Sequence, residues 1–118
     1  MVNYTADSVA LVCRELEDAR LPPHVMIDCS HANCNKDYTR QALVCRDVAA
    51  QIAKGDKRII GVMLESNLVA GAQKLVPGQS LVYGQSITDA CIGWDETLPL
   101  LRELATAVRS AAFEGRRI

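Results

Sequence analysis

The sequence predicts an α/β fold in which short buried strands run parallel and alternate with amphipathic helices. Three observations support this prediction. Two apolar runs, residues 24–29 and 58–64, have the length of strands and the composition of strands buried on both faces. Residues 38–54 separate them with helical periodicity, and strands joined by such a crossover helix run parallel. Further helical patterns precede the first run and follow the second, so helices are available to cover the sheet.

The first half of the chain is predicted to form two helices and one strand. Apolar side chains recur every three or four residues over Ala6–Arg20, which indicates an amphipathic helix. Pro22–Pro23 ends it, because a residue that precedes proline is disfavoured in helical geometry. The strand His24–Cys29 follows, and a polar loop leads to a second helix over Tyr38–Lys54. Gly55 then provides a left-handed cap.

The second half is predicted to contain one strand, one long irregular segment and one helix. The strand Arg58–Leu64 leads directly into Ser66–Trp94, which has no sustained periodicity. Such long segments are commonly functional or disordered, and the apolar residues in this one favour order. The last helix is predicted from Thr97 to about residue 112, with Thr97 or Asp95 as its N-cap and Pro99 in its first turn.

Composition and charge exclude several functional classes. The 118 residues carry a net charge of −1, and the basic residues are scattered, so no nucleic-acid or anionic-membrane surface is expected. No targeting segment or membrane-spanning stretch is visible. The five cysteines are an odd number and fall partly in elements with apolar periodicity. Free thiols in a reducing, cytoplasmic environment are therefore expected.

Two predicted strands are too few for a complete sheet. Each strand would keep one unpaired edge, and its apolar side chains would be exposed there. We therefore expect residues 1–118 to form a single, incomplete domain that belongs to a larger fold. On its own the chain should expose apolar surface and tend to associate.

Polar side chains gather where the predicted strands end. Functional sites in parallel α/β folds lie at the C-terminal ends of the strands. His31 follows the first strand, Glu65 follows the second, and Asp89 lies in the long segment that leaves the same end. One imidazole and two carboxylates on one face suit a borderline divalent metal. Metal binding is thus one of two interpretations of these residues.

The other interpretation is purely structural. A single histidine after a strand, such as His31, is more often a hydrogen-bonding loop residue than a ligand. Glu65 alone is compatible with a salt bridge, and Asp89 forms a capping-box pattern with Ser86. The residues alone leave both interpretations open.

Two further site types are disfavoured by spacing. A Ser–His–Asp hydrolase built on Ser30 or Ser66 with His31 and Asp89 is disfavoured, because Ser30 lacks the glycine elbow that exposes a serine nucleophile. A structural zinc site on Cys29 and Cys34 is rejected, because the spacing is not that of a zinc ribbon and no second cysteine pair follows.

Three long segments resemble the closing part of type I 3-deoxy-D-arabino-heptulosonate 7-phosphate (DAHP) synthases. They are Met26–Asn33 (MIDCSHAN), Ile59–Ser66 (IIGVMLES) and Tyr83–Trp94 (YGQSITDACIGW). The resemblance covers nearly the whole chain, and three long motifs in order are far more specific than one short pattern. It implies a (β/α)8 TIM barrel, of which this chain supplies the last two strand–helix units.

The resemblance also implies a function. The family condenses phosphoenolpyruvate with erythrose 4-phosphate, releasing phosphate, in the first step of the shikimate pathway to aromatic amino acids. Its divalent metal (manganese, iron, cobalt or zinc) is bound by a cysteine from an early strand and by residues that match His31, Glu65 and Asp89. His31 also matches a residue close to bound phosphoenolpyruvate, which implies a catalytic and substrate-binding role. Ser30 and Asn33 are candidates to orient its imidazole, and the family forms dimers or tetramers.

Departures from the family pattern limit what the chain alone is expected to do. The family's phosphate-binding arginines and lysines and its cysteine ligand lie upstream, and none of the five cysteines takes that place. Asn67 replaces a histidine and Cys34 a serine that many relatives carry. We therefore expect the chain to be inactive alone. The alternative is a non-catalytic truncated remnant that binds metal weakly or associates with a full-length barrel.

Overall fold

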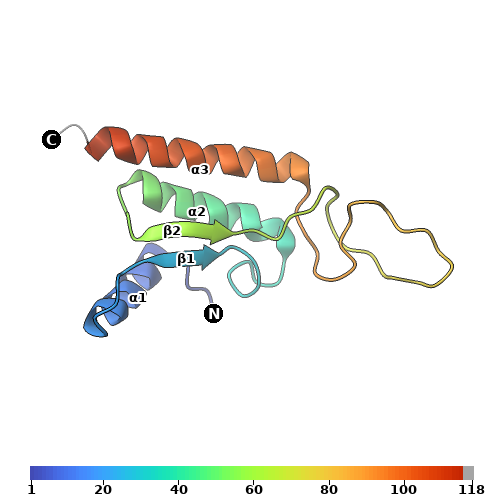
Figure 1. The fold of residues 1–118 in the computed structure, drawn as a ribbon, viewed down its shortest axis with the longest axis horizontal. Coiled ribbons are helices and arrows are strands. Elements are labelled where there is room, and N and C mark those ends of the chain that lie inside the picture. The colour runs from blue at the N-terminus through green and yellow to red at the C-terminus, as the bar shows by residue number, and fades with distance from the viewer. Residues whose placement is uncertain (116–118) are drawn as a thin grey trace.

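The computed structural model describes residues 1–115 and has the predicted order of elements (Figure 1). The elements are α1 (Ala6–Asp18), β1 (Val25–Asp28), the 3-10 helix η1 (Tyr38–Arg40), α2 (Gln41–Ala53), β2 (Ile59–Met63) and α3 (Trp94–Gly115). No helix among the described residues is long and apolar enough to span a membrane.

The two strands form a parallel sheet, as predicted. Val25 lies opposite Ile59 and Asp28 lies opposite Met63, with one irregularity in register after Val25. Because the strands are parallel, both end at the same edge of the sheet. The loop after β1 and the segment after β2 therefore leave the sheet side by side (Figure 1).

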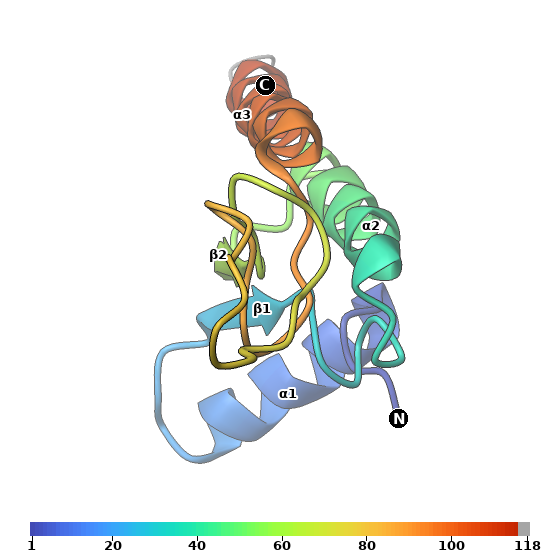
Figure 2. The same cartoon turned by 90° about the vertical axis from the view of Figure 1, so that its right-hand side faces the viewer.

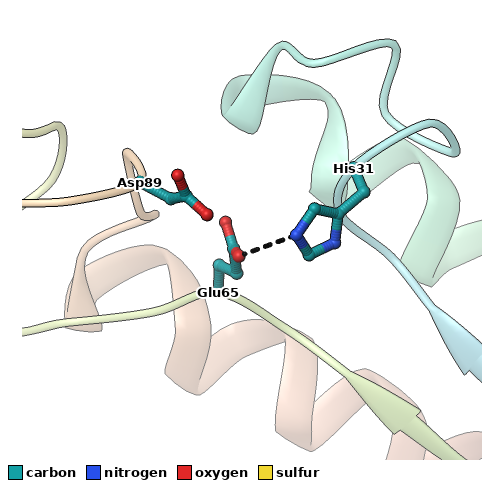
Figure 3. Close-up of side chains that lie close together, drawn as sticks. All are labelled: His31, Glu65 and Asp89. Atoms are coloured by element: carbon teal, nitrogen blue, oxygen red, sulfur yellow. Dashed lines mark ion pairs between the residues drawn. The ribbon is translucent and has the colours of Figure 1, made fainter.

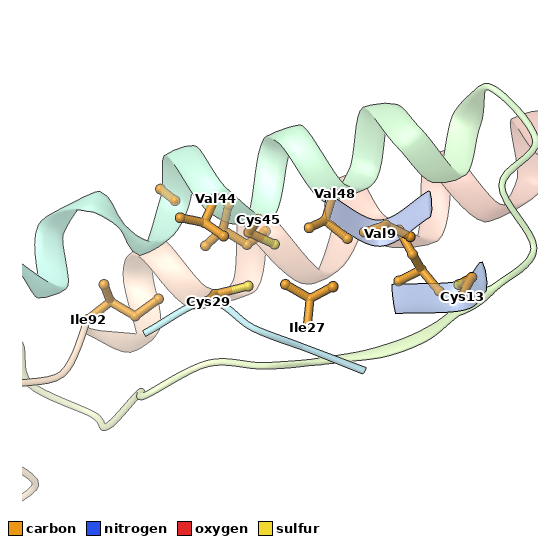
Figure 4. Close-up of a cluster of buried hydrophobic side chains, with 11 residues drawn as sticks. Val9, Cys13, Ile27, Cys29, Val44, Cys45, Val48 and Ile92 are labelled. Carbon is orange, nitrogen blue, oxygen red and sulfur yellow. The ribbon is translucent and has the colours of Figure 1, made fainter. Parts of the chain in front are cut away.

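The core lies between this sheet and its helices. In Figure 2 the three helices lie in an arc around the strands, with α1 below, α2 beside and α3 above. Their apolar faces meet in one cluster of buried side chains (Figure 4). Its members are Val9, Cys13, Ile27, Cys29, Ala42, Val44, Cys45, Val48, Ile59, Ile92 and Leu100. All five cysteines are free thiols, and four of them are buried.

The opposite face of the sheet is open, although both strands have the composition of strands buried on two faces. Met26 on β1 is 63% exposed and Ile60 on β2 is 65% exposed. Side chains alternate between the two faces of a strand, so their neighbours Ile27 and Ile59 point into the core. The expectation of exposed apolar surface on the strands is therefore confirmed.

Helix α3 begins three residues before the predicted start. The predicted N-caps are wrong: Asp95 lies inside the first turn, and the buried Thr97 hydroxyl donates to the carbonyl oxygen of Gly93 at 2.9 Å. Gly93 also accepts from the backbone N–H groups of Glu96 and Thr97, which sets the start of the helix at Trp94. The proline at position 99 consequently lies in the second turn instead of the first.

The long segment that follows the end of β2, residues 66–93, is ordered mainly by hydrogen bonds. The Gln73 amide donates to the carbonyl oxygens of Val82 (2.8 Å) and Gln85 (3.0 Å), and its oxygen accepts from the Val82 N–H at 2.9 Å. Most of its large apolar side chains contribute little to this order, since Leu75 is 65% and Tyr83 87% exposed, whereas Ile92 near its end is buried in the core. The predicted order is present, but its cause differs from the apolar packing we expected.

Candidate metal centre

The three predicted ligands meet at the edge of the sheet where both strands end (Figure 3). His31, Glu65 and Asp89 each offer one ligand atom, and these atoms all lie within 4.8 Å of one another. Nε2 of His31 lies 3.4 Å from Oε1 of Glu65. The three side chains come from the loop after β1, the end of β2 and the long segment that returns to the sheet before α3.

The loop after β1 directs His31 toward this site through an unusual backbone conformation. His31 has φ = 51°, in the left-handed region that costs a residue with a side chain about 1–2 kcal/mol. Its carbonyl oxygen accepts from the Lys36 N–H at 2.9 Å. The Asn33 amide donates to the carbonyl oxygens of Asp28 and of the Asn3 side chain, both at 2.8 Å. These bonds offset the strain and hold the loop in place.

Asp28 restrains the imidazole of His31. One carboxylate oxygen lies 2.9 Å from Nδ1 of His31, and the other accepts from the Ser30 N–H at 2.8 Å. The hydrogen bond to Asp28, followed by the negative charges of Asp28 and Glu65, raises the pKa of the His31 imidazole. Ser30 and Asn33, the candidates to orient this ring, contact other groups instead.

Glu65 is held at both its side chain and its backbone. The Ser30 hydroxyl donates to Oε2 of Glu65 at 3.0 Å. The Gln41 amide donates to the Glu65 carbonyl oxygen at 3.0 Å and accepts from the Glu65 N–H at 2.8 Å. Gln41 is completely buried, so these two bonds are shielded from water and fix where the strand end lies.

Asp89 is exposed and is held less firmly. Its backbone carbonyl accepts from the Cys91 thiol at 3.5 Å, and Cys91 forms an isolated antiparallel bridge with Gly71. Its carboxylate forms no hydrogen bond with another residue in the described range 1–115. Ser86 accepts from the Thr88 N–H and no helix begins there, so the capping-box interpretation of Asp89 is wrong.

These side chains line a cavity of about 350 Å³. The lining residues are Ser30, His31, Ala32, Cys34, Lys36, Tyr38, Glu65, Asp89 and Ala90.

The sequence pattern selected His31, Glu65 and Asp89 as candidate ligands, but it assigned no role to Lys36, Gln41 or Asp28. Of these, only Asp28 carried a signal, because it ends a strand three residues before the histidine. The other histidine, His24, is exposed just before the opposite end of β1.

The donor set fits a divalent cation. Oxygen and nitrogen ligands lie about 2.0–2.2 Å from zinc, so two ligands of one such ion are at most about 4.4 Å apart. Ligand atoms within 4.8 Å of one another therefore need to move by only a few tenths of an ångström. One imidazole and two carboxylates suit manganese, iron, cobalt or zinc and do not distinguish among them.

Comparisons with known proteins identify relatives that match most of the chain. A model of the DAHP synthetase I family matches residues 1–102. The phospho-2-dehydro-3-deoxyheptonate aldolase of Haemophilus influenzae is 55% identical over 106 residues, 90% of this chain and 29% of that protein. The Phe-sensitive enzyme of the same name from Escherichia coli K12 is 57% identical over 108 residues, 92% of this chain and 31% of that protein.

A solved structure matches the fold as well. Phospho-2-dehydro-3-deoxyheptonate aldolase from Francisella tularensis has a TM-score of 0.86 and 42% sequence identity. The match covers 92% of this chain and 31% of that one. The chain thus spans about 30% of the length of the relatives it matches.

Proposed function

The chain belongs to the DAHP synthetase I family, and we propose that it carries most of the metal site of a 3-deoxy-7-phosphoheptulonate synthase. That enzyme condenses phosphoenolpyruvate with erythrose 4-phosphate to give DAHP and phosphate. The observation that carries the proposal is the convergence of His31, Glu65 and Asp89 in a chain 57% identical to a relative named as this aldolase. Because the chain spans about 30% of its relatives, the activity is proposed for a complete polypeptide or assembly.

In that complete enzyme, we propose that residues 1–118 form the last two strand–helix units of a single (β/α)8 barrel. The parallel pair of strands, with helices on one side only, supports this placement. The exposed side chains of Met26 and Ile60 would then face the interior of the barrel, which is filled by side chains from alternate strands. The apolar composition of both strands has a physical reason in such an arrangement.

The proposed metal ligands are Nε2 of His31 and one carboxylate oxygen each of Glu65 and Asp89. A divalent cation bound there supplies a Lewis acid for the aldehyde oxygen of erythrose 4-phosphate. The chain's own residues fix the geometry: Asp28 holds the imidazole, while Ser30 and Gln41 hold Glu65. The 350 Å³ cavity beside them offers room for a substrate next to His31.

The chain alone is proposed to be inactive. Among the described residues that line the cavity, Lys36 is the only lysine or arginine. Two phosphorylated substrates require several charge-assisted hydrogen bonds, and one lysine cannot compensate both. The second candidate function, a non-catalytic remnant that associates with barrel segments of another chain, is favoured by the open apolar face around Met26 and Ile60.

A chimera tests the proposed function. The matching 31% of the Phe-sensitive E. coli relative is replaced by this chain, and DAHP formation is measured with manganese. We expect turnover in the chimera and none from the chain alone. His31→Ala should lower turnover by more than about 100-fold, since loss of even an outer partner of a metal ligand costs about 10–100-fold.

The matched control is His24→Ala, which removes the other histidine, exposed at the opposite end of β1. It should leave turnover within about twofold, because surface substitutions away from a site have small effects. A chimera that melts cooperatively and yet forms no DAHP would favour the remnant. Equal loss of turnover in both histidine variants would remove His31 from the site.

A further inference from the structure

One carboxylate outside the proposed ligand set contacts that set directly. Asp28 is the last residue of β1 and is paired in the sheet with Met63. Its Oδ1 accepts from the Ser30 N–H at 2.8 Å, and its Oδ2 lies 2.9 Å from Nδ1 of His31. The carboxylate is therefore fixed from two directions, by the strand backbone and by the turn that follows.

Asp28 is not itself placed to be a ligand. Within the described part of the chain, the group of side chains with ligand atoms within 4.8 Å of one another contains His31, Glu65 and Asp89 but not Asp28. Asp28 lies on the other side of the imidazole from this group, since Nδ1 meets Asp28 and Nε2 lies 3.4 Å from Glu65. Asp28 therefore affects the proposed metal site only through the imidazole ring of His31.

The hydrogen bond selects one tautomer of the neutral imidazole. A carboxylate only accepts hydrogen bonds, so Nδ1 must carry the proton that it donates to Asp28. Nε2 is then left with a free electron pair that points toward Glu65. A metal ligand needs such an electron pair, and the nitrogen that carries the proton cannot supply one.

The restraint matters because packing does not provide it. The side chain of His31 is 56% exposed, so few neighbouring atoms limit rotation of the ring. Without Asp28, the ring would rotate freely until it bound an ion. The entropy lost on binding would then lower the affinity for the ion.

We propose that Asp28 is a positioning residue that fixes the tautomer and orientation of His31, so that Nε2 is the atom that binds metal. This inference rests on the proposed metal site. Carboxylate–histidine pairs of this kind commonly support metal-ligating histidines.

The decisive variant is Asp28→Asn, which keeps the shape of the side chain and an oxygen for the Ser30 N–H. The remaining amide group is a donor, so Nδ1 of His31 must accept and its proton moves to Nε2. The matched control is Asp37→Asn, which makes the same charge change in the same loop. Asp37 accepts from the Thr39 N–H and hydroxyl.

Two readouts test the proposal. Nitrogen-15 NMR of the histidine rings in the metal-free 118-residue chain should show His31 protonated on Nδ1 in the parent and in Asp37→Asn, but on Nε2 in Asp28→Asn. Manganese affinity, measured by electron paramagnetic resonance, should fall about 10–100-fold in Asp28→Asn and less than about twofold in Asp37→Asn. Cobalt absorption spectra of the same variants in the chimera repeat the measurement in a complete barrel.

Failure of this inference differs from failure of the proposed metal site. If His31→Ala abolishes manganese binding while Asp28→Asn keeps the parent's affinity and tautomer, the role of Asp28 is overturned and the metal site stands. If His31→Ala binds manganese as the parent does, the metal site itself is wrong. Equal losses in Asp28→Asn and Asp37→Asn would show a general effect of charge and would also overturn the proposal.

Discussion

The proposed ligands near the C-terminal ends of β1 and β2 are held more firmly than the proposed ligand in the long segment after β2. At the strand ends, His31 is hydrogen-bonded to Asp28, and Glu65 is hydrogen-bonded to Ser30 and the buried Gln41. In the long segment, Asp89 is exposed, and its carboxylate has no hydrogen bond within residues 1–115. Two of the proposed ligands are thus positioned by side-chain hydrogen bonds, and the side chain of the third is not, within the described residues.

The difference follows from how each region is held. Parallel strands are joined by a continuous series of backbone hydrogen bonds. These bonds restrict the backbone at the strand ends and so limit the positions of the side chains there. The long segment is held by hydrogen bonds of Gln73 and Gln85 and by isolated bridges, while most of its large apolar side chains, such as Leu75 and Tyr83, are exposed. The cavity therefore has two walls held by the strand ends and one wall formed by a surface segment, and such segments are generally more mobile than the elements they connect.

The largest expected effect comes from removing a ligand on the rigid side. Glu65→Gln should weaken manganese binding by more than about 100-fold, because it removes a charge that is already in place. Asp89→Asn should weaken manganese binding by only about 10-fold, because ordering the exposed segment around Asp89 costs entropy that offsets part of its interaction with the ion. Calorimetric titration of both variants in the chimera measures the two losses.

The reverse order of the two losses would contradict the assignment of the strand ends as the rigid side of the site. A larger loss for Asp89→Asn would mean that the long segment, and not the strand ends, contributes most of the binding. Glu96→Gln is the matched control: Glu96 lies in the first turn of α3, outside the lining of the cavity, and its substitution should leave affinity unchanged.

A smaller effect is expected on folding. Gln41→Leu removes two hydrogen bonds to Glu65. The Glu65 carbonyl oxygen still accepts from the Ile92 N–H, but the Glu65 N–H loses its partner, which should cost about 2 kcal/mol in the free energy of unfolding. Gln73→Leu also removes bonds to backbone groups, but these lie in the long segment near water. It should cost less than about 1 kcal/mol, because water can replace the lost partners. Urea denaturation of the chimera compares the two.

Similar losses for the two glutamine variants would contradict the view that the strand ends are the rigid part of the site. A larger loss for Gln73→Leu would mean that the long segment stabilises the fold more than its exposed side chains indicate.

Periodicity and local composition predicted the parallel strands and the helices, and they brought His31, Glu65 and Asp89 to one edge of the sheet as candidate ligands. The rule that sites lie at strand ends selected His31 and Glu65, because both follow apolar runs directly. The roles of Asp28 and Gln41 could not be predicted, because they depend on contacts across space. Gln41 lies 24 positions from Glu65, and nothing in a single sequence indicates that its amide meets that backbone.

The start of α3 was missed for a similar reason. Thr97 has the side chain of an N-cap, but its hydroxyl is buried and contacts Ser66 from the segment after β2. That tertiary contact overrides the local preference of threonine for a capping position.

Anomalous X-ray diffraction would locate an ion bound to His31, Glu65 and Asp89. Crystals of the chimera grown with manganese would be measured at a wavelength where manganese scatters anomalously. We predict one peak within about 2.0–2.4 Å of Nε2 of His31 and of a carboxylate oxygen from both Glu65 and Asp89. A manganese peak elsewhere, with these three side chains bound to no ion, would show that they do not form the metal site.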